Sequence, residues 1–431
     1  VNTIEDIDTF SKKYYDSDLL REIKRYKRSS DFNALSSINS LRTEIFLETE
    51  ELLIRNKDAR VFYLEAPTGS GKTNTSINLA LKLIEYDRTL NNIFYIFPFN
   101  TLVEQTASTL SNYFSADDMA VVNSVTPINN NNNKDITRET DEETDYNSLW
   151  LNRLLNNYNL VVTTHVNFFD ALFGTDKEQI FPLIKLCNSV IIIDEIQNYR
   201  NYIWPEIIIF LSNYAELLNM RIIIMSATLP RIDRVFDVND VTFAELLEDS
   251  QKYYKHHIFR NRVKIDTSLM VNNDMDLDIL ADHVISNADK KVLVEFITKT
   301  GARDFMNIIL SKIEQKGLKN IKVFELTGDD CSLKRKEVIC KTKIDEPVII
   351  IATQVIEAGI DIDMDIGYKE ISLPDAEEQF LGRINRSCSK SGCVAYFFNK
   401  TKPETIYKKD CRINHSINNP EILEYLREKD F

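Results

Sequence analysis

The segment VFYLEAPTGSGKTNTSINLALKLIEY, from Val61 to Tyr86, constrains the fold of this chain more than any other. Its short apolar start predicts a buried strand, and its end has the apolar period of a helix. The glycine-rich turn between them can surround a phosphate group with backbone N–H groups and a helix N-terminus. Only the first glycine of the usual P-loop pattern is replaced, by Ala66. The turn therefore predicts a nucleotide site formed by Pro67, Thr68, Gly69, Ser70, Gly71, Lys72 and Thr73.

A second segment, VIIIDEIQNY from Val190 to Tyr199, changes abruptly from β-branched residues to two adjacent carboxylates. The apolar run is too short for a buried helix and predicts an interior strand of a parallel sheet. The alternative is a strand that simply ends in solvent. Because the carboxyl ends of parallel strands meet at one edge, the P-loop instead gives Asp194 and Glu195 a chemical role. We expect Thr73 and Asp194 to hold Mg²⁺, and Glu195 to deprotonate the water that attacks the γ-phosphate of ATP.

Strands and helices alternate along most of the chain, and the alternating series occurs twice. This order predicts an α/β protein with two tandem RecA-like P-loop domains, each a mostly parallel sheet flanked by helices, with a cleft between them. The first domain should cover residues 38–250 and the second residues 260–400. Residues 1–37 should form a lead-in, residues 127–146 a disordered polar insertion, and residues 401–431 a C-terminal extension.

The composition limits the classes of function. The net charge of −14 removes any global attraction to nucleic acid, so binding of a nucleic acid has to be local. No apolar segment approaches the roughly 20 residues of a membrane-spanning helix, and the first residues lack the pattern of a signal peptide. We therefore expect a cytoplasmic protein with no membrane partner. Position 1 is Val rather than Met, which suggests a processed, trimmed or excised chain.

The six cysteines are few for a chain of 431 residues, and we expect them to be reduced thiols. Their spacing leaves one alternative open, a zinc site with three cysteines and one histidine. Its ligands would be Cys388, Cys393, Cys411 and His415. The sequence SKSG inside the first pair is equally that of an ordinary hairpin loop, which is the interpretation we favour.

The segment DAEEQFLGRINR, from Asp375 to Arg386, carries cations in the second predicted domain. A helix through it would place Gln379, Arg383 and Arg386 on one face. Two guanidinium groups and an amide suit a phosphate that gains charge in the transition state, as an arginine finger does. The alternative is a solvated basic helix face. Because these residues lie in the other domain from the P-loop, hydrolysis would require closure of the cleft.

Five motifs together resemble those of superfamily 2 helicases. APTGSGKT, DEIQ, SATLP, ATQVIEAGIDID and QFLGRINR look like motifs I, II, III, V and VI in their order and spacing. DEIQ followed by an aromatic residue, SATLP and GRINR most resemble the helicase core of the CRISPR-associated type I interference helicase-nuclease, as does the upstream INSLRTEI. Gln197 stands where DEAD-box RNA helicases have a second Asp, which counts against that branch.

The resemblance implies a motor that uses ATP and Mg²⁺ to move 3′ to 5′ along single-stranded DNA. That DNA would be the non-target strand of an R-loop, and the RNA-guided CRISPR effector complex would recruit the motor. Such an acidic motor can grip a strand through backbone N–H groups, hydroxyls and helix N-termini. The catalytic residues implied are Lys72, Asp194, Glu195, Gln379, Arg383 and Arg386, with Gly359 and Asp361 at the nucleotide.

The resemblance also supplies candidates for coupling or DNA binding. They are Pro98, Thr101, Thr164, His165, Gln197, Ser226, Thr228, Thr298, Thr353, Gln354 and Glu357. For the hydroxyls and aromatics at strand ends, such as the segments FPFNT and TTH, ordinary loop packing is the alternative. We therefore expect single-stranded DNA as a partner because of the motifs, and not because of the charge of the chain.

Two departures from that family matter. The nuclease of that family uses a metal site with adjacent His and Asp residues. None of the histidines here forms such a His-Asp pair with suitable partners, so we expect no nuclease activity from this chain. The histidines are His165, His256, His257, His283 and His415. The nuclease would be a separate polypeptide or a fused part upstream of Val1, and the chain has little room for a C-terminal covering domain. Two other functions stay open, another superfamily 2 DNA or RNA helicase and a nucleotide-gated nucleic-acid-binding module. Binding alone would not need Glu195, Gln379, Arg383 and Arg386, so their presence argues against the binding module.

Overall fold

A computed structural model describes residues 3–123, 148, 150–199, 203–227, 243–270, 274–318, 321–344, 346–356, 359–408 and 410–430. The chain forms two compact units. The first comprises Val1–Ser30, Arg42–Glu65 and Gly71–Glu248, and the second comprises Asp31–Leu41, Ala66–Ser70 and Asp249–Phe431. The predicted insertion at residues 127–146 lies outside the described residues, and so do Thr228 and Glu357.

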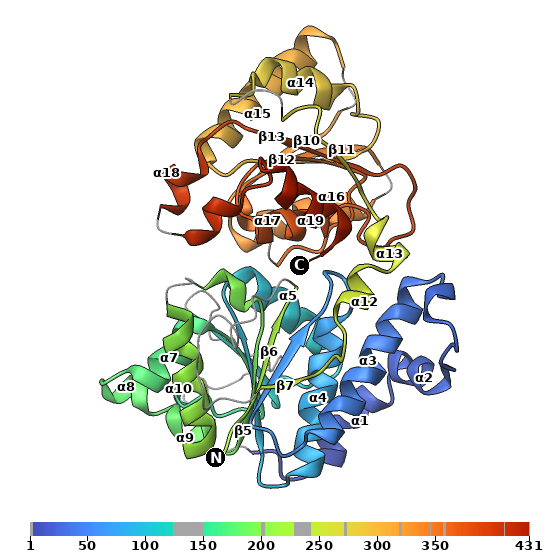
Figure 1. Ribbon diagram of the computed structural model, residues 1–431. Helices are drawn as coiled ribbons and strands as arrows, with labels where there is room; N and C mark the ends of the chain where they lie inside the picture. Colours follow the sequence, from blue (N-terminus) through green and yellow to red (C-terminus); the bar gives the residue numbers. More distant parts are fainter. Residues whose placement is uncertain are drawn as a thin grey trace, which may run out of the picture. The chain divides into compact units, whose positions relative to one another are not determined.

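A seven-stranded sheet forms the centre of the first unit (Figure 1). Its strand order is β3-β4-β2-β5-β6-β1-β7, and every neighbouring pair is parallel. The strands are β1 (Val61–Glu65), β2 (Asn92–Phe97), β3 (Met119–Val122), β4 (Leu160–Thr164), β5 (Ser189–Ile193), β6 (Arg221–Ser226) and β7 (Phe243–Glu245). All carboxyl ends therefore lie along one edge of this sheet.

Helices cover both faces of the first sheet. Figure 1 shows α7 and α10 on one face, with α3 and α4 on the other. The helices of this part of the chain are α1 (Ile7–Tyr15), α2 (Asp18–Arg25), α3 (Ile38–Arg55), α4 (Lys72–Tyr86), α5 (Asn100–Leu110), α7 (His165–Phe173), α8 (Lys177–Ile180), α9 (Leu183–Leu186), η2 (Ile196–Asn198) and α10 (Trp204–Leu217). Because side chains alternate along a strand, Ile191 and Ile193 pack with Trp204 and Leu211 in one core cluster. Every residue of β5 is buried, which confirms the predicted interior strand.

The second unit contains a six-stranded sheet with the order β10-β11-β9-β12-β13-β8, again with parallel neighbours. Its strands are β8 (Lys264–Asp266), β9 (Lys291–Glu295), β10 (Val323–Leu326), β11 (Val348–Ala352), β12 (Ile366–Glu370) and β13 (Val394–Phe398). Its helices are η1 (Phe32–Ala34), α12 (Gln251–Tyr254), α13 (His257–Arg260), α14 (Leu277–Ile285), α15 (Lys299–Gln315), α16 (Ser332–Lys343), η4 (Gln354–Ile356), α17 (Pro374–Leu381), α18 (Pro403–Tyr407), η5 (Cys411–His415) and α19 (Pro420–Glu428).

Two core clusters cover the faces of the second sheet. Helices α14 and α15 lie on one face, and α16, α17 and α19 lie on the other (Figure 1). The predicted α/β architecture of two parallel sheets flanked by helices is therefore confirmed, while the cleft between them stays a prediction. Within the described part of the chain, no helix combines the length and the apolar character that crossing a membrane requires.

Gly367 allows α17 to lie close to β12. A Cβ atom at this position would come within 2.7 Å of the Phe380 ring and 2.9 Å of Ile384 Cδ1. Both neighbours belong to the second core, where dense packing leaves little room for a shift. The missing side chain of Gly367 therefore sets how closely the segment with the predicted arginines approaches the sheet.

We expect Gly367→Ala to lower the free energy of unfolding by about 1–3 kcal/mol, because it overpacks this contact. Urea unfolding followed by circular dichroism measures the change. Gly328→Ala is the matched control, since a Cβ atom there would have no neighbour within 4 Å. Equal stability of both variants would contradict the close approach of α17.

Candidate functional site

The P-loop turn is held by two glycines in the left-handed conformation. Gly69 has φ 86° and Gly71 has φ 89°, values that residues with a Cβ atom rarely adopt. Gly71 is the N-cap of α4, which begins at Lys72, and no side chain caps this helix end. The hydroxyl of Ser70 is buried and has no hydrogen-bond partner in the described part of the chain. Uncapped N–H groups and an unsatisfied hydroxyl fit the phosphate group that the sequence predicts.

Tyr95 supports the first turn of α4 from β2. Its hydroxyl lies 2.9 Å from the hydroxyl of Ser76, which donates a hydrogen bond of 3.0 Å to the backbone oxygen of Thr73. Burial and the charge of Asp194 raise the pKa of Tyr95, so this hydroxyl keeps its proton. Tyr95 is not among the site residues predicted from the sequence. Its position in the buried run NIFYIF, next to the P-loop helix, is the only signal that could have pointed to it.

Asp194 directly follows β5 and is buried, with an exposed fraction of 6%. Its Oδ1 atom accepts a hydrogen bond of 2.9 Å from the backbone N–H of Glu195. Burial, followed by the charge of Glu195, raises the pKa of Asp194 to about 7, and the charge of Lys72 acts in the opposite direction. A buried carboxylate within the electrostatic influence of Lys72, the first residue of α4, fits the oxygen donors that Mg²⁺ prefers.

Glu195 adopts a left-handed conformation, with φ 52° and ψ 46°, which is unusual for a residue with a side chain. Its side chain accepts a hydrogen bond from the amide of Gln197, and the amide oxygen of Gln197 accepts one from the hydroxyl of Ser226. Gln197 and Ser226 are buried. The structure thus brings Glu195, Gln197 and Ser226 into one chain of hydrogen bonds from the carboxylate turn to the end of β6.

The ends of β2 and β4 form a second group of predicted residues. Phe97 and Thr164 are paired in register; α7 begins immediately after β4, and α5 begins at Asn100, shortly after the end of β2. Neither helix has a side-chain cap at its N-terminus. Pro98, Thr101, Thr164 and His165 all lie at this edge, where Thr101 and Thr164 are each 9% exposed. Burial lowers the pKa of His165, so its imidazole is neutral at neutral pH.

The predicted helix through the second-unit arginines is wrong beyond Leu381. Helix α17 ends there, and Gly382 is its C-cap. Ile384 then forms a bridge with Met364, and Asn385 takes a left-handed conformation with φ 47°. The pairing with the sheet and the left-handed residue stop the helical period. Gln379 therefore lies on α17, whereas Arg383 and Arg386 lie on the following turns and do not share a helix face with it.

These arginines contact the segment that carries the predicted motif V. The Nε atom of Arg383, which is 7% exposed, donates a hydrogen bond of 3.0 Å to the backbone oxygen of Ile356. The Nε atom of Arg386 lies 3.3 Å from Oδ1 of Asp361. Its Nη1 atom is buried and has no hydrogen-bond partner in the described ranges. Gly359, also predicted at the nucleotide, has φ 81°. Arg386 is thus the better placed of the two arginines for a further anionic ligand.

The other coupling candidates of the second unit have structural contacts. Thr298 is the N-cap of α15, and its hydroxyl accepts a hydrogen bond of 3.0 Å from the backbone N–H of Gly301. Thr353 is buried after β11. The amide of Gln354 donates a hydrogen bond of 2.7 Å to the hydroxyl of Tyr407. The cap and the hydrogen bond to Tyr407 are sufficient to explain Thr298 and Gln354 without a DNA contact.

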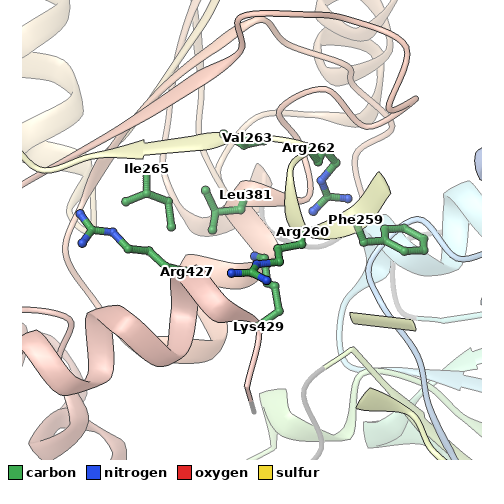
Figure 2. A pocket seen from close by; sticks show the side chains of 8 residues that line it. All are labelled: Phe259, Arg260, Arg262, Val263, Ile265, Leu381, Arg427 and Lys429. Carbon is green, nitrogen blue, oxygen red and sulfur yellow. The ribbon is translucent and has the colours of Figure 1, made fainter. Parts of the chain in front are cut away.

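The second unit contains a small cavity of about 50 Å³, and Figure 2 shows the side chains that line it. It is lined by Phe259, Arg260, Arg262, Val263, Ile265, Leu381, Arg427 and Lys429. Each of the four cations has a carboxylate partner: Arg260 pairs with Glu428, Arg262 and Lys429 pair with Glu378, and Arg427 pairs with Glu424. A space that admits only a few water molecules, with its charges already paired, is not a nucleotide site.

Across the described residues, no group of three or more His, Cys, Asp or Glu side chains is arranged to hold a metal ion. The candidate zinc ligands Cys388, Cys393, Cys411 and His415 are all described, and they do not come together in such a group. Thr73 and Asp194 stay the predicted ligands of Mg²⁺, because this ion is commonly held by one or two protein groups plus phosphate oxygens.

Two family models match the chain. The model described as DEAD/DEAH box helicase matches residues 43–235, and the model described as CRISPR-associated nuclease/helicase Cas3, C-terminal, matches residues 305–389. The P-loop, the DEIQ turn and two parallel sheets agree with these matches. Residues 43–235 thus resemble a DEAD/DEAH box helicase domain, and residues 305–389 resemble the C-terminal part of a Cas3 nuclease/helicase.

Similar proteins narrow this class. The CRISPR-associated nuclease/helicase Cas3 of Methanothermobacter thermautotrophicus is 28% identical over 345 residues, which are 75% of this chain and 38% of that protein. The T. fusca Cas3–AMPPNP structure has a TM-score of 0.61 at 13% identity and covers 92% of this chain and 52% of that chain. The Mycobacterium smegmatis helicase Lhr, bound to ssDNA and AMP-PNP, has a TM-score of 0.57 at 15% identity and covers 91% of this chain and 50% of that chain.

The helicase core of this chain is Cas3-like, as the second family model and the curated relatives agree. The two solved structures show the fold alone at their low identities. The chain spans less than half of the length of the curated relatives that it matches, 45% of one and 38% of the other. The nuclease activity named in the descriptions of these relatives is therefore not assigned to this chain.

We expect Asp194→Asn to stabilise the protein in the absence of Mg²⁺ and nucleotide. A carboxyl group with a folded pKa of about 7, above its ordinary value of 3.8, destabilises the folded state above pH 7, and this penalty disappears as the pH falls towards 3.8. The gain in the free energy of unfolding should be larger at pH 8 than at pH 5.5, by on the order of 1–2 kcal/mol.

Thermal unfolding at the two pH values measures this difference. Asp282→Asn is the control, because the pKa of the Asp282 carboxyl is shifted in the opposite direction. Hydrogen bonds from Lys312 and Lys316 lower this pKa, so removal of the carboxylate should not stabilise the protein at pH 8. A loss of stability on Asp194→Asn at pH 8 would show that the buried carboxylate has a partner that offsets its burial.

Proposed function

We propose that this chain is an ATP-dependent translocase that moves 3′ to 5′ on single-stranded DNA and acts in CRISPR interference against foreign DNA. The observation that carries ATP hydrolysis is the turn after β5, where buried Asp194 and strained Glu195 lie next to the charge of Lys72. The Cas3-like core supports the CRISPR role, and the edge at β2 and β4 supports binding of a single strand.

Hydrolysis needs few protein groups. The uncapped N-terminus of α4 and Lys72 bind the phosphates, while Thr73 and Asp194 would hold Mg²⁺. Mg²⁺, when bound, neutralises charge on the phosphate oxygens. Glu195 accepts a proton from water as the water oxygen forms a bond to the γ-phosphorus, and the bond from that phosphorus to the bridging oxygen of ADP breaks. The hydrogen bond from Gln197 orients the carboxylate of Glu195 for this step.

Nucleic acid binds, in this proposal, at the N-termini of α5 and α7. Both helices begin at or shortly after the ends of neighbouring strands and lack side-chain caps, so their N–H groups suit the phosphates of a single strand. Such local binding is compatible with the net charge of −14. The ssDNA in the structure of the similar helicase Lhr supports a single strand as the ligand.

The partners in this proposal are the non-target DNA strand of an R-loop, the RNA-guided CRISPR effector complex and a separate or fused His/Asp nuclease. The second candidate function is another superfamily 2 helicase that acts on duplex DNA or on RNA. The match of residues 43–235 to the DEAD/DEAH box helicase model is compatible with this second candidate as well as with the first.

We expect single-stranded DNA to stimulate steady-state ATP hydrolysis more strongly than duplex DNA or single-stranded RNA. The assay compares these ligands in the presence of Mg²⁺. Glu195→Gln is the control for chemistry, since loss of the general base should reduce turnover roughly 10²-fold or more while ATP binding persists. Stimulation by RNA alone would favour the second candidate. ATP binding without turnover in the wild type would indicate a nucleotide-gated binding module.

We expect Arg386→Ala to lower the kcat of ATP hydrolysis by at least about tenfold and to change the KM for ATP little, because an arginine finger acts on charge that develops in the transition state. The same assay over a range of ATP concentrations separates the two constants. Arg260→Ala is a control from the same unit, because Arg260 is paired at the surface with Glu428. A rise in KM with unchanged kcat would make Arg386 a residue that binds ATP in the ground state.

A further inference from the structure

Tyr199 lies between the carboxylate turn and helix α7 of the first unit. Its ring meets the imidazole of His165 edge to face, with ring centroids 4.9 Å apart and planes at 87°. A second edge contact, at 6.2 Å, joins it to Phe169 of the same helix. Its backbone oxygen accepts a hydrogen bond of 3.1 Å from the indole of Trp204. Tyr199 is 5% exposed, so the residue two positions after Gln197 is fixed against α7.

His165 stands at the other end of this contact. It is the first residue of α7 and directly follows β4. Its imidazole interacts with the backbone of Phe97 and Pro98, at the end of the neighbouring strand β2. His165 therefore touches both of the strand ends that we propose for nucleic acid. A continuous set of packed groups runs from this edge through Tyr199 to the turn of Glu195.

Both rings carry a buried polar atom that has no hydrogen-bond partner in the described part of the chain. These atoms are the hydroxyl oxygen of Tyr199 and Nδ1 of His165. Phenylalanine would make the same ring contact as Tyr199 without burying an unsatisfied hydroxyl, which is unfavourable. The hydroxyl of Tyr199 can donate a hydrogen bond, and Nδ1 of His165 can accept one. Because the two rings are already in contact, a small movement could bring these two atoms together in a second arrangement of the pair.

We propose that Tyr199 is a positioning residue that couples nucleic-acid binding at the ends of β2 and β4 to the placement of Glu195, through its contact with His165. This inference rests on the proposed function, because it requires a nucleic acid at that edge. A strand that binds the N-terminus of α7 shifts His165, and the hydroxyl of Tyr199 then donates a hydrogen bond to Nδ1. The movement of Tyr199 reorients the short turn that holds Glu195 in its left-handed conformation.

The test measures ATP hydrolysis by the full chain, without nucleic acid and with saturating single-stranded DNA or single-stranded RNA. We expect Tyr199→Leu to lower the stimulated kcat at least about fivefold, while the unstimulated kcat and the Kd for a fluorescent oligonucleotide stay within about twofold of the wild type. Tyr199→Phe, which keeps the ring and loses the hydroxyl, should lose part of the stimulation. A purely structural role would change the unstimulated rate as much as the stimulated one.

Tyr214→Leu is the matched control. Tyr214 also packs against α7, where its hydroxyl donates a hydrogen bond of 3.0 Å to the backbone oxygen of Leu172, but it contacts the other end of the helix. This variant should keep the stimulation of the wild type. Loss of stimulation in Tyr214→Leu to the same extent as in Tyr199→Leu would overturn the inference.

A double-variant cycle with His165→Ala tests the pair itself. If the contact carries the coupling, nucleic acid stimulates ATP hydrolysis by the double variant at least as much as by the less stimulated of the two single variants. If the two single losses of stimulation multiply in the double variant, the inference is overturned. Full stimulation of Tyr199→Leu would overturn the coupling and leave the proposed function intact. No stimulation of the wild type by any nucleic acid would overturn both. If Tyr199→Leu does not fold, Tyr199→Phe decides, and unchanged stimulation of that variant would overturn the inference.

Discussion

The parallel register of the first sheet is the constraint on which the rest of the structure depends. Glu65 of β1 is paired with Ser226 of β6, and Phe97 of β2 is paired with Thr164 of β4. These pairings bring the P-loop, the carboxylate turn and the starts of α5 and α7 to one edge. Because strands such as β5 are buried on both faces, a slip in register would move every side chain to the wrong cluster. Apolar packing thus determines where the polar chemistry takes place.

The functional edge contains several unfavourable local features that the packed sheet can offset. Asp194 is a buried carboxylate with a raised pKa, Glu195 has a left-handed backbone, and Tyr199 buries a hydroxyl that lacks a partner among the described residues. Such features persist where the surrounding structure determines them from several sides. They concentrate within a few residues after β5, in the segment that we propose for phosphoryl chemistry, which needs a carboxylate in a fixed position.

The strands that carry the motifs were predictable, because each is a short apolar run followed by an abrupt polar change. Strand β1 is the predicted run VFYLE, and β5 is the predicted run before Asp194. Strand β12, with the sequence IGYKE, was not predictable in this way because it contains a glycine and two charged residues. Its Lys369 is fully buried and forms an ion pair with Glu295 of the neighbouring strand β9. Only the tertiary partner makes such a residue compatible with the core.

The end of α17 could be located only in part by local reasoning. The spacing of Gln379, Arg383 and Arg386 fits a helix and no proline lies between them, but Gly382 is a residue type that often ends a helix and is the C-cap here. The bridge between Met364 and Ile384, a contact distant in sequence, then fixes the chain beyond the helix. The Glu195 turn could be located from its motif, but its left-handed backbone and its link to Ser226 could not be derived from spacing, because both depend on the neighbouring strand.

The two units share a local backbone feature at the residues that we propose for phosphoryl chemistry. Glu195 itself is in the left-handed conformation, at φ 52°, and Arg386 directly follows Asn385, which has φ 47°. Side-chain hydrogen bonds hold both turns. In the first unit the amide of Gln197 donates to the carboxylate of Glu195. In the second unit the amide of Asn385 donates to the backbone oxygens of Arg262 and Lys390. A helix would have spread these groups along its length, whereas a tight turn fixed by its own polar contacts gives one side chain a single direction. That property is the one that a hydrolytic carboxylate and an arginine finger both need.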